Sequence, residues 1–139
     1  MRNHSPTTNA LLNTLQSIVA AHAGDRFTTN DIVHFDFTPA NILVDGGRIG
    51  GVIDWDGACA GDRTFDLATL LFYTYDQPET RAPLWQTALK QSGPAALRVY
   101  LAHLILRQVE WSIRYHDQAA AEHWLERAND ILRAYVFPN

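Results

Sequence analysis

The chain has 139 residues, of which 47% are hydrophobic, and its formal net charge is −4. That length and composition provide a core large enough for a globular domain, which excludes a disordered chain. Eleven basic residues against fifteen acidic ones give no positive surface for nucleic acid, and no apolar run is long enough to span a membrane.

The cysteine content and the amino-terminal residues bear on the cellular compartment. The single cysteine, Cys59, can form no internal disulfide and has no second cysteine at a metal-binding spacing. The amino-terminal residues carry no apolar signal segment behind basic residues. These features predict a cytoplasmic protein in which Cys59 is a small buried side chain.

Residues 5–23 have the pattern of an amphipathic helix. Ser5 suits the N-cap, Pro6 suits the first helical position, and Gly24 suits the end of the helix. One stripe of side chains would face the core: Leu11, Leu12, Leu15, Ile18, Val19 and His22.

A loop rich in polar side chains follows the apolar residues 32–33. It carries His34 and Asp36 before Pro39 and Asn41 after it, and the proline marks a bend rather than a helix face. We therefore expect polar groups to converge where the backbone is irregular.

A β-hairpin is predicted for residues 42–53. Two apolar runs, 42–44 and 49–53, flank the turn at 45–48, which contains two glycines. A second glycine pair lies inside the later run and precedes no helix, so we expect turn and bulge roles for these glycines and not a phosphate-binding loop.

The pairing of this hairpin places two oxygen-bearing side chains at its open end. If Val44 pairs with Ile49, Asn41 lies opposite Val52, and Asp54 follows the paired strands. Diagonal neighbours on paired strands lie roughly 7–8 Å apart, close enough for Asn41 and Asp54 to lean toward a common cation. One amide oxygen and one carboxylate suit Mg²⁺, which takes its other ligands from water and phosphate.

Asp36 is left for a catalytic role. It precedes Asn41 by five residues on the same loop, where its carboxylate could orient a hydroxyl group and accept its proton during phosphoryl transfer. The chain contains neither an H-E-x-x-H zinc motif nor the G-x-S-x-G motif of an acyl-transfer serine, so we set these two chemistries aside.

Helices are predicted for the rest of the chain, over residues 64–75, 84–93, 94–116 and 118–135. Thr64 and Asp117 suit the N-caps of the first and last, and Gly93 followed by Pro94 separates the two between them. The side chains expected to face the core include Ala68, Leu71, Phe72, Tyr75, Leu97, Leu101, Leu104, Ile105, Gln108, Trp111, Tyr115, Ala121, Trp124, Ala128, Ile131 and Tyr135.

Two acidic residues each keep two interpretations. Asp66 lies in the first turn of a predicted helix, where the helix dipole favours a carboxylate, and it could also hydrogen-bond the polar loop. Glu110 could line a pocket for a cationic substrate or form an exposed ion pair with Arg114, four residues further on.

Three motifs in order, H-x-D-x4-N, I-D-W and G-D-x3-D-L-A, resemble the aminoglycoside phosphotransferase family, which is related to the protein kinases. The matching residues are His34, Asp36, Asn41, Asp54, Trp55, Gly61, Asp62, Asp66, Leu67 and Ala68. The position after His34, commonly glycine in this family, is Phe35.

The resemblance implies a role for each of five residues. Asp36 would be the catalytic base, Asn41 and Asp54 would bind Mg²⁺ and the nucleotide, and His34 and Asp66 would support the catalytic loop. The nucleotide would be ATP, with GTP left open, and the acceptor would be a hydroxyl group of a small molecule.

The resemblance also implies a fold, an α+β and mostly helical C-terminal lobe of the kinase-like kind over residues 1–139, with a small hairpin at the catalytic rim. A complete member resembles a kinase in having a preceding lobe with a strand-borne lysine, yet the only lysine is Lys90, far downstream.

Two interpretations follow: a catalytic lobe that needs an amino-terminal lobe, or a non-catalytic remnant that binds a partner. In either case the rim would expose apolar groups, which favours a homodimer or capture of another chain.

Overall fold

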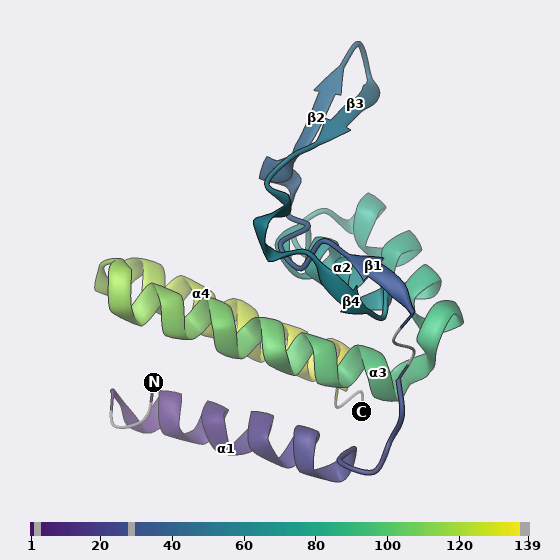
Figure 1. Ribbon diagram of the computed structural model, residues 1–139. Helices are drawn as coiled ribbons and strands as arrows, with labels where there is room; N and C mark the ends of the chain where they lie inside the picture. The colour runs from purple at the N-terminus through teal and green to yellow at the C-terminus, as the bar shows by residue number, and fades with distance from the viewer. Residues whose placement is uncertain (2–3, 28–29, 137–139) are drawn as a thin grey trace. The chain divides into compact units, whose positions relative to one another are not determined.

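The computed structural model describes residues 1, 4–27 and 30–136, which fold as two compact units. The helical unit consists of Met1–Asp25 and Arg98–Asn139, and the mixed unit, which contains the strands, consists of Arg26–Leu97. Figure 1 labels the elements of both. The expectation of one lobe over residues 1–139 stays a prediction.

In the part of the chain that the structure describes, the helical unit is built from α1 (Pro6–Ala21), the second half of α3 (Pro78–Tyr115) and α4 (Gln118–Ile131), followed by a π-helical segment at Leu132–Val136. Figure 1 shows α1 and α4 running along α3. The buried apolar side chains of this unit are Leu11, Leu15, Ile18, Leu101, Ala102, Leu104, Ile105, Val109, Ala121, Leu125, Ala128, Ile131 and Leu132.

The start of α1 follows the prediction. The Ser5 hydroxyl accepts the Thr8 N–H at 3.1 Å, while the Thr8 hydroxyl accepts the Ser5 N–H at 3.0 Å. This reciprocal pair satisfies backbone donors that a helix start leaves unpaired. The helix begins at Pro6 and ends at Ala21.

The long helix α3 is interrupted at Gly93. This glycine has φ 77° and ψ 176°, a conformation outside the helical region that glycine adopts without strain, and Pro94 starts the second half. The first half begins at Pro78 and not at residue 84, because proline suits the first position of a helix. No helix among residues 4–27 and 30–136 is both long and apolar enough to cross a membrane.

The predicted core stripe of α3 is wrong near its end. Trp111 and Tyr115 are 53% and 64% exposed, and their rings lie 4.3 Å apart. The buried face passes through Val109 and Ser112 instead. A shift of one residue turns a side chain by about 100° around the helix axis, which moves the predicted residues out of the core.

The mixed unit contains all the described strands, which form two antiparallel pairs, β1 with β4 and β2 with β3. In chain order its elements are β1 (Asp31–Val33), η1 (Pro39–Asn41), β2 (Ile42–Asp45), β3 (Arg48–Val52), η2 (Trp55–Gly57), β4 (Cys59–Gly61), α2 (Thr64–Tyr73) and the first half of α3. Its buried apolar side chains are Val33, Phe65, Ala68, Leu71, Phe72, Ala88, Ala96 and Leu97.

The hairpin pairing departs from the predicted register by one residue. Val44 pairs with Ile49 as expected, but Val52 lies opposite Ile42 and not opposite Asn41. A bulge takes up one glycine of β3 and shifts the register between the two ends of the hairpin. The glycines of β3 thus serve a bulge, as predicted.

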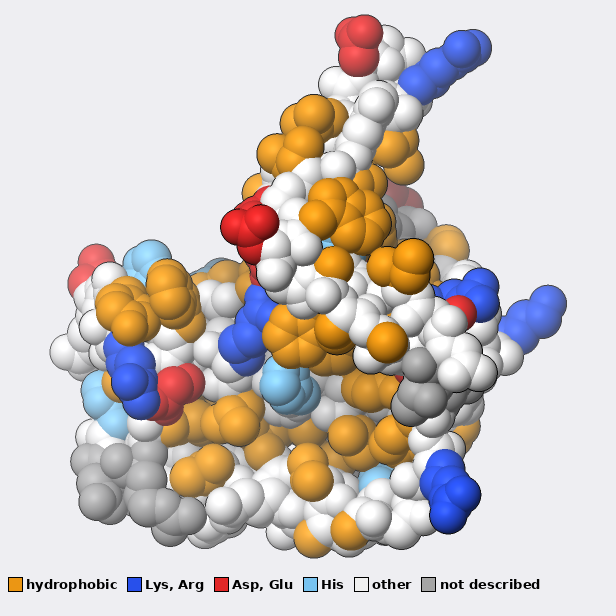
Figure 2. Space-filling view, in the orientation of Figure 1, with side chains coloured by type: hydrophobic (Ala, Val, Ile, Leu, Met, Phe, Trp, Pro, Cys, Tyr) orange, Lys and Arg blue, Asp and Glu red, His pale blue; other side chains and the backbone are white. Residues whose placement is uncertain are grey.

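Several large apolar side chains of the hairpin and of the residues after it are exposed to solvent. Figure 2 shows them along the projecting hairpin. The exposed residues are Leu43, Val44, Ile49, Ile53 and Trp55, with exposed fractions between 45% and 69%. This matches the expectation of apolar groups left in water at the rim.

The pairing of β1 with β4 explains one glycine and corrects one prediction. A Cβ added at Gly61 would lie 3.0 Å from Val33 Cγ2, so this close approach of the strands favours glycine. Cys59 pairs with Val33 but is exposed, contrary to prediction. A sheet of only two strands leaves its outer face to solvent.

The start of α2 also differs from the prediction. The Thr64 N–H donates to Asp62 Oδ1 at 2.9 Å, so Asp62 caps the helix and Thr64 lies inside it, fully buried. The helix ends at Tyr73, and Tyr75 lies beyond its end.

Candidate active site

One carboxylate of α2 holds the loop between β1 and η1. Asp66 Oδ2 accepts the His34 N–H at 2.8 Å, and Asp66 Oδ1 accepts the Phe35 N–H at 3.1 Å. Two consecutive backbone donors of the loop thus share both oxygens of one side chain. This geometry favours a bracing role for Asp66 over that of a simple helix charge.

The His34 side chain ties the same loop to the end of the hairpin. It is 1% exposed, its Nε2 lies 2.8 Å from the Ile53 carbonyl oxygen, and its Nδ1 lies 3.3 Å from the Asp36 nitrogen. Because a carbonyl oxygen only accepts and a backbone N–H only donates, these partners fit the neutral ring with its proton on Nε2. The rings of Trp55 and Phe37 lie 4.6 Å and 5.7 Å from it.

Phe35 gives the loop an unusual turn. Its φ of 71° lies in the left-handed region that favours glycine. Its ring stacks on that of Phe65 in the first turn of α2, with centroids 4.9 Å apart and 7° between the planes.

Asp36 and Asn41 are brought together by the bend at η1. Asn41 Nδ2 donates to the Asp36 carbonyl oxygen at 2.8 Å and lies 3.3 Å from Asp36 Oδ2. The Thr38 N–H donates to the same carbonyl oxygen at 2.8 Å, which tightens the bend. With its nitrogen toward Asp36, the Asn41 amide presents its oxygen on another side.

Asp54 lies beside Asn41 at the open end of the hairpin. The Ile53 N–H donates to the Asn41 carbonyl oxygen at 3.0 Å, which fixes the two backbones next to each other. Asp54 is exposed and has a left-handed φ of 64°. The predicted arrangement of Asn41 and Asp54 at one end therefore survives the change in register.

The donors at this end fit a hard divalent cation. An amide oxygen and an exposed carboxylate are ligands that Mg²⁺ uses together with phosphate and water. Among residues 4–27 and 30–136, no group of three or more His, Cys, Asp or Glu side chains could hold a metal.

A cluster of three polar side chains connects the start of α2 to Ser92 in the first half of α3. The Ser92 hydroxyl donates to Asp62 Oδ1 at 3.0 Å and lies 2.7 Å from the Thr64 hydroxyl. Sequence reasoning missed this contact because the bond joins residues thirty positions apart, and the motif that contains Asp62 does not extend to Ser92.

An ion pair joins β1 to the same region. Arg63 Nη2 lies 2.6 Å from Asp31 Oδ1, and the Arg63 N–H donates to the other carboxylate oxygen at 3.2 Å. The hydrogen bond from the Arg63 side chain, and then that from its backbone, hold the pKa of Asp31 below its usual value.

In the helical unit, Glu110 forms the ion pair that one interpretation predicted. Its Oε1 lies 2.6 Å from Arg114 Nη2, and its other oxygen contacts the Met1 amino group. Hydrogen bonds from that amino group and from Arg114 lower the pKa of Glu110.

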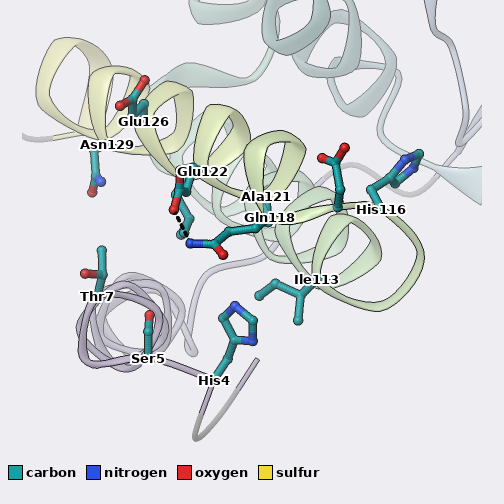
Figure 3. Close-up of a pocket in the computed structure, with 12 residues that line it drawn as sticks. His4, Ser5, Thr7, Ile113, His116, Gln118, Ala121, Glu122, Glu126 and Asn129 are labelled. Carbon is teal, nitrogen blue, oxygen red and sulfur yellow. Dashed lines mark hydrogen bonds between the residues drawn. The ribbon is translucent and has the colours of Figure 1, made fainter.

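The helical unit also contains a pocket of about 650 Å³ between the start of α1 and α4. Figure 3 shows His4 and Ser5 facing Gln118 and Glu122, which share a hydrogen bond of 2.7 Å. Its acidic lining residues are Asp117, Glu122 and Glu126. None of the predicted site residues lines it.

Comparison with known proteins places the chain among phosphotransferases. A family model described as the phosphotransferase enzyme family matches residues 9–100. A hygromycin-B 4-O-kinase from Escherichia coli is 33% identical over 100 residues, which are 66% of this chain and 28% of that relative.

Two solved structures share the fold. A thermostable mutant of the aminoglycoside phosphotransferase APH(4)-Ia, in a ternary complex with AMP-PNP and hygromycin B, is 26% identical with a TM-score of 0.78, over 96% of this chain and 46% of that one. The apo form of a thermostable mutant of the same enzyme is 24% identical with a TM-score of 0.75, over 96% of this chain and 47% of that one. These matches confirm the expected α+β, mostly helical fold, and the chain spans less than half the length of these relatives.

Proposed function

This chain belongs to the phosphotransferase enzyme family, and on that premise we propose that it is the catalytic lobe of an ATP-dependent phosphotransferase. The reaction moves the γ-phosphate of ATP to a hydroxyl group of a small molecule. The observation that carries the proposal is the loop in which Asp36 lies against Asn41 while Asp66 and His34 hold the backbone on either side.

Asp36 is the proposed base. Its carboxylate orients the acceptor hydroxyl group and takes its proton as the acceptor oxygen bonds to the γ-phosphorus and the bond to the ADP oxygen breaks. Asp66 and His34 act through the backbone, since both bind loop N–H groups and neither needs to touch the substrate. Phosphoryl transfer depends mostly on such positioning.

Asn41 and Asp54 are the proposed ligands of Mg²⁺ and, through it, of the nucleotide. When bound, the ion neutralises charge on the phosphates. The support for this role is the donor chemistry of the two side chains and the backbone bond between Asn41 and Ile53 that keeps them adjacent. ATP is favoured because a matching solved structure holds AMP-PNP, with GTP as the alternative.

The acceptor is proposed from the relatives. The curated relative is a hygromycin-B 4-O-kinase, and a matching structure holds hygromycin B. A small alcohol of the aminoglycoside kind is therefore the first acceptor to test. We place the protein in the cytoplasm, in keeping with its single exposed cysteine and the absence of any disulfide it could form within the chain.

We also propose that residues 1–139 act as one C-terminal lobe that requires an amino-terminal lobe to clamp the nucleotide. The only lysine, Lys90, lies in α3, whereas related kinases supply the phosphate-binding lysine from a strand.

The test is a transfer assay on the purified chain, with and without the amino-terminal half of a relative supplied as a second protein. Hygromycin B and labelled ATP serve as substrates, and the Asp36→Asn variant serves as the matched control. Transfer by the complemented parent and none by the variant supports the proposal. Equal signals from both contradict it.

A second candidate, a non-catalytic module that binds a partner, is favoured by the exposed apolar side chains of the hairpin. The genomic sequence upstream of Met1 separates the two. A glycine-rich strand pair followed by a lysine supports the enzyme, and its absence supports the binding module.

A further inference from the structure

We propose that the stack of Phe35 on Phe65 is a positioning device for Asp36, an inference that rests on the proposed function for its catalytic part. Phe35 has a φ of 71°, a conformation that side chains with a Cβ rarely adopt. Such a conformation persists only where the surroundings hold it in place. The contacts of Phe35 show what does so.

The ring of Phe35 lies against α2 and near η2. It is parallel to the Phe65 ring, with 7° between the planes, and Phe65 is only 7% exposed. Gly57 of η2 lies near Phe35, because a Cβ added at Gly57 would lie 3.8 Å from Phe35 Cβ and Cδ1.

The backbone of Phe35 is held by the neighbouring residue of α2. Its N–H donates to Asp66 Oδ1, and Asp66 follows Phe65 in the chain. One turn of α2 thus grips both the ring and the N–H of Phe35. Removing the ring contact therefore removes one of the contacts that hold the strained backbone in place.

The turn at Phe35 sets the direction of the next peptide, which carries Asp36. The Asp36 N–H points to His34 Nδ1, and its carbonyl oxygen accepts from Asn41 Nδ2. If Phe35 relaxed to a negative φ, both bonds would be misdirected. The stack therefore fixes where the Asp36 carboxylate lies, although Phe65 belongs to another element.

The first test is amide hydrogen exchange on the chain itself. Phe65→Leu removes the stack, and Phe72→Leu makes the same change at a fully buried residue seven positions further along the same helix. We expect Phe65→Leu to speed exchange at Phe35 and Asp36 by about tenfold relative to Leu71, because loss of a local contact opens the loop without unfolding α2. Phe72→Leu should change the exchange rates of Phe35, Asp36 and Leu71 by the same factor.

A coupling measurement makes the test sharper. In a Phe35→Gly background the turn needs no stack, so adding Phe65→Leu should leave Asp36 exchange unchanged relative to Leu71. Phe35→Leu removes the same ring contact by changing the less buried of the two residues. It replaces Phe65→Leu if that variant does not fold. Equal effects of Phe65→Leu with and without Phe35 would refute the proposal.

The second test uses the complemented transfer assay. Phe65→Leu should lower kcat by about tenfold per folded molecule and leave the KM for ATP within about twofold, because a base displaced by a fraction of an ångström slows transfer without weakening binding. Phe72→Leu should leave kcat per folded molecule unchanged. A parallel loss of kcat in both variants would reduce the stack to a general stabilising contact. If the parent transfers no phosphate, the proposed function fails, and the exchange result still decides whether the stack holds the turn.

Discussion

At the scale of single residues, Asp36 carries the sharpest prediction. Asp36→Asn should lower turnover by about 10²–10⁴-fold, because an amide of the same shape cannot accept the hydroxyl proton. The unfolding free energy should change little, since the shorter bonds from the Asn41 and Thr38 donors go to the backbone oxygen of Asp36, and an amide oxygen can still accept the longer one to Oδ2. The complemented transfer assay and a urea titration measure both quantities.

Asp45→Asn is the matched control for this prediction, because Asp45 is an exposed aspartate at the hairpin turn. It should keep full activity. Turnover of Asp36→Asn within a few-fold of the parent would remove Asp36 from the role of base.

Asp54 and Asn41 are predicted to set the Mg²⁺ requirement. Asp54→Ala or Asn41→Ala should raise the Mg²⁺ concentration needed for half-maximal transfer, because each change removes one of few protein ligands. Asn41→Ala also loses the bond to the Asp36 carbonyl oxygen, so Asp54→Ala is the cleaner variant. Asp56→Ala, two residues away and also exposed, should leave the Mg²⁺ requirement as it is. An unchanged Mg²⁺ titration for Asp54→Ala would exclude it as a ligand.

Asp66 is predicted to matter for stability as well as for catalysis. Asp66→Ala should lower the unfolding free energy by about 1–3 kcal/mol, the cost of leaving two loop N–H groups without their acceptor. Asp66→Asn retains one acceptor oxygen and should cost less. Asp130→Ala, at an exposed ion pair, is the control and should shift the denaturation midpoint little. Equal midpoints for Asp66→Ala and the parent would mean that the brace contributes nothing.

At the scale of elements, local patterns predicted the start of α1 and the break in α3, because Ser5, Gly93 and Pro94 act on their own backbone. The end of α1 at Ala21 falls two residues before the predicted one. The turn of the hairpin and the pairing of Val44 with Ile49 were predicted, but the shift of register toward the open end was not. The bulge in β3 depends on how the strands pack. A pair of glycines permits a bulge but does not determine where it lies.

Contacts between elements were harder to foresee. The stack of Phe35 on Phe65 and the bond from Ser92 to Asp62 each join residues about thirty positions apart. Sequence patterns predict which side chains of an element face the core, but they do not predict which side chains of another element those side chains contact. The role of Asp66 was accessible only because a family resemblance supplied the pairing.

The cluster behind α2 gives a prediction at this scale. Ser92→Ala should lower the unfolding free energy by about 1–3 kcal/mol, because Asp62 is buried and would lose a donor to its carboxylate. Thermal or urea unfolding measures the change. Ser17→Ala is the control, since its hydroxyl bonds a carbonyl oxygen on the exposed face of α1. If both variants unfold at the parent's midpoint, the cluster does not support α2.

At the scale of the whole molecule, the chain contains the proposed catalytic loop and spans 28% of its curated relative and less than half of the solved ones. The loop, the hairpin and α2 are nevertheless tied together by bonds within residues 26–97. The mixed unit therefore holds the proposed base in place through contacts of its own.

The isolated chain is accordingly predicted to bind Mg-ATP weakly and to transfer phosphate negligibly. Phosphoryl transfer depends on positioning and on charge neutralisation, and the only lysine lies on α3 rather than on a strand over the phosphates. The apolar side chains of the hairpin, 45–69% exposed from Leu43 to Trp55, should also favour a dimer. Calorimetry with Mg-ATP and sedimentation of the purified chain measure both properties. Micromolar affinity for Mg-ATP, or steady phosphorylation of an added alcohol without a second protein, would mean that α1 or a second copy takes the place of the clamping lobe.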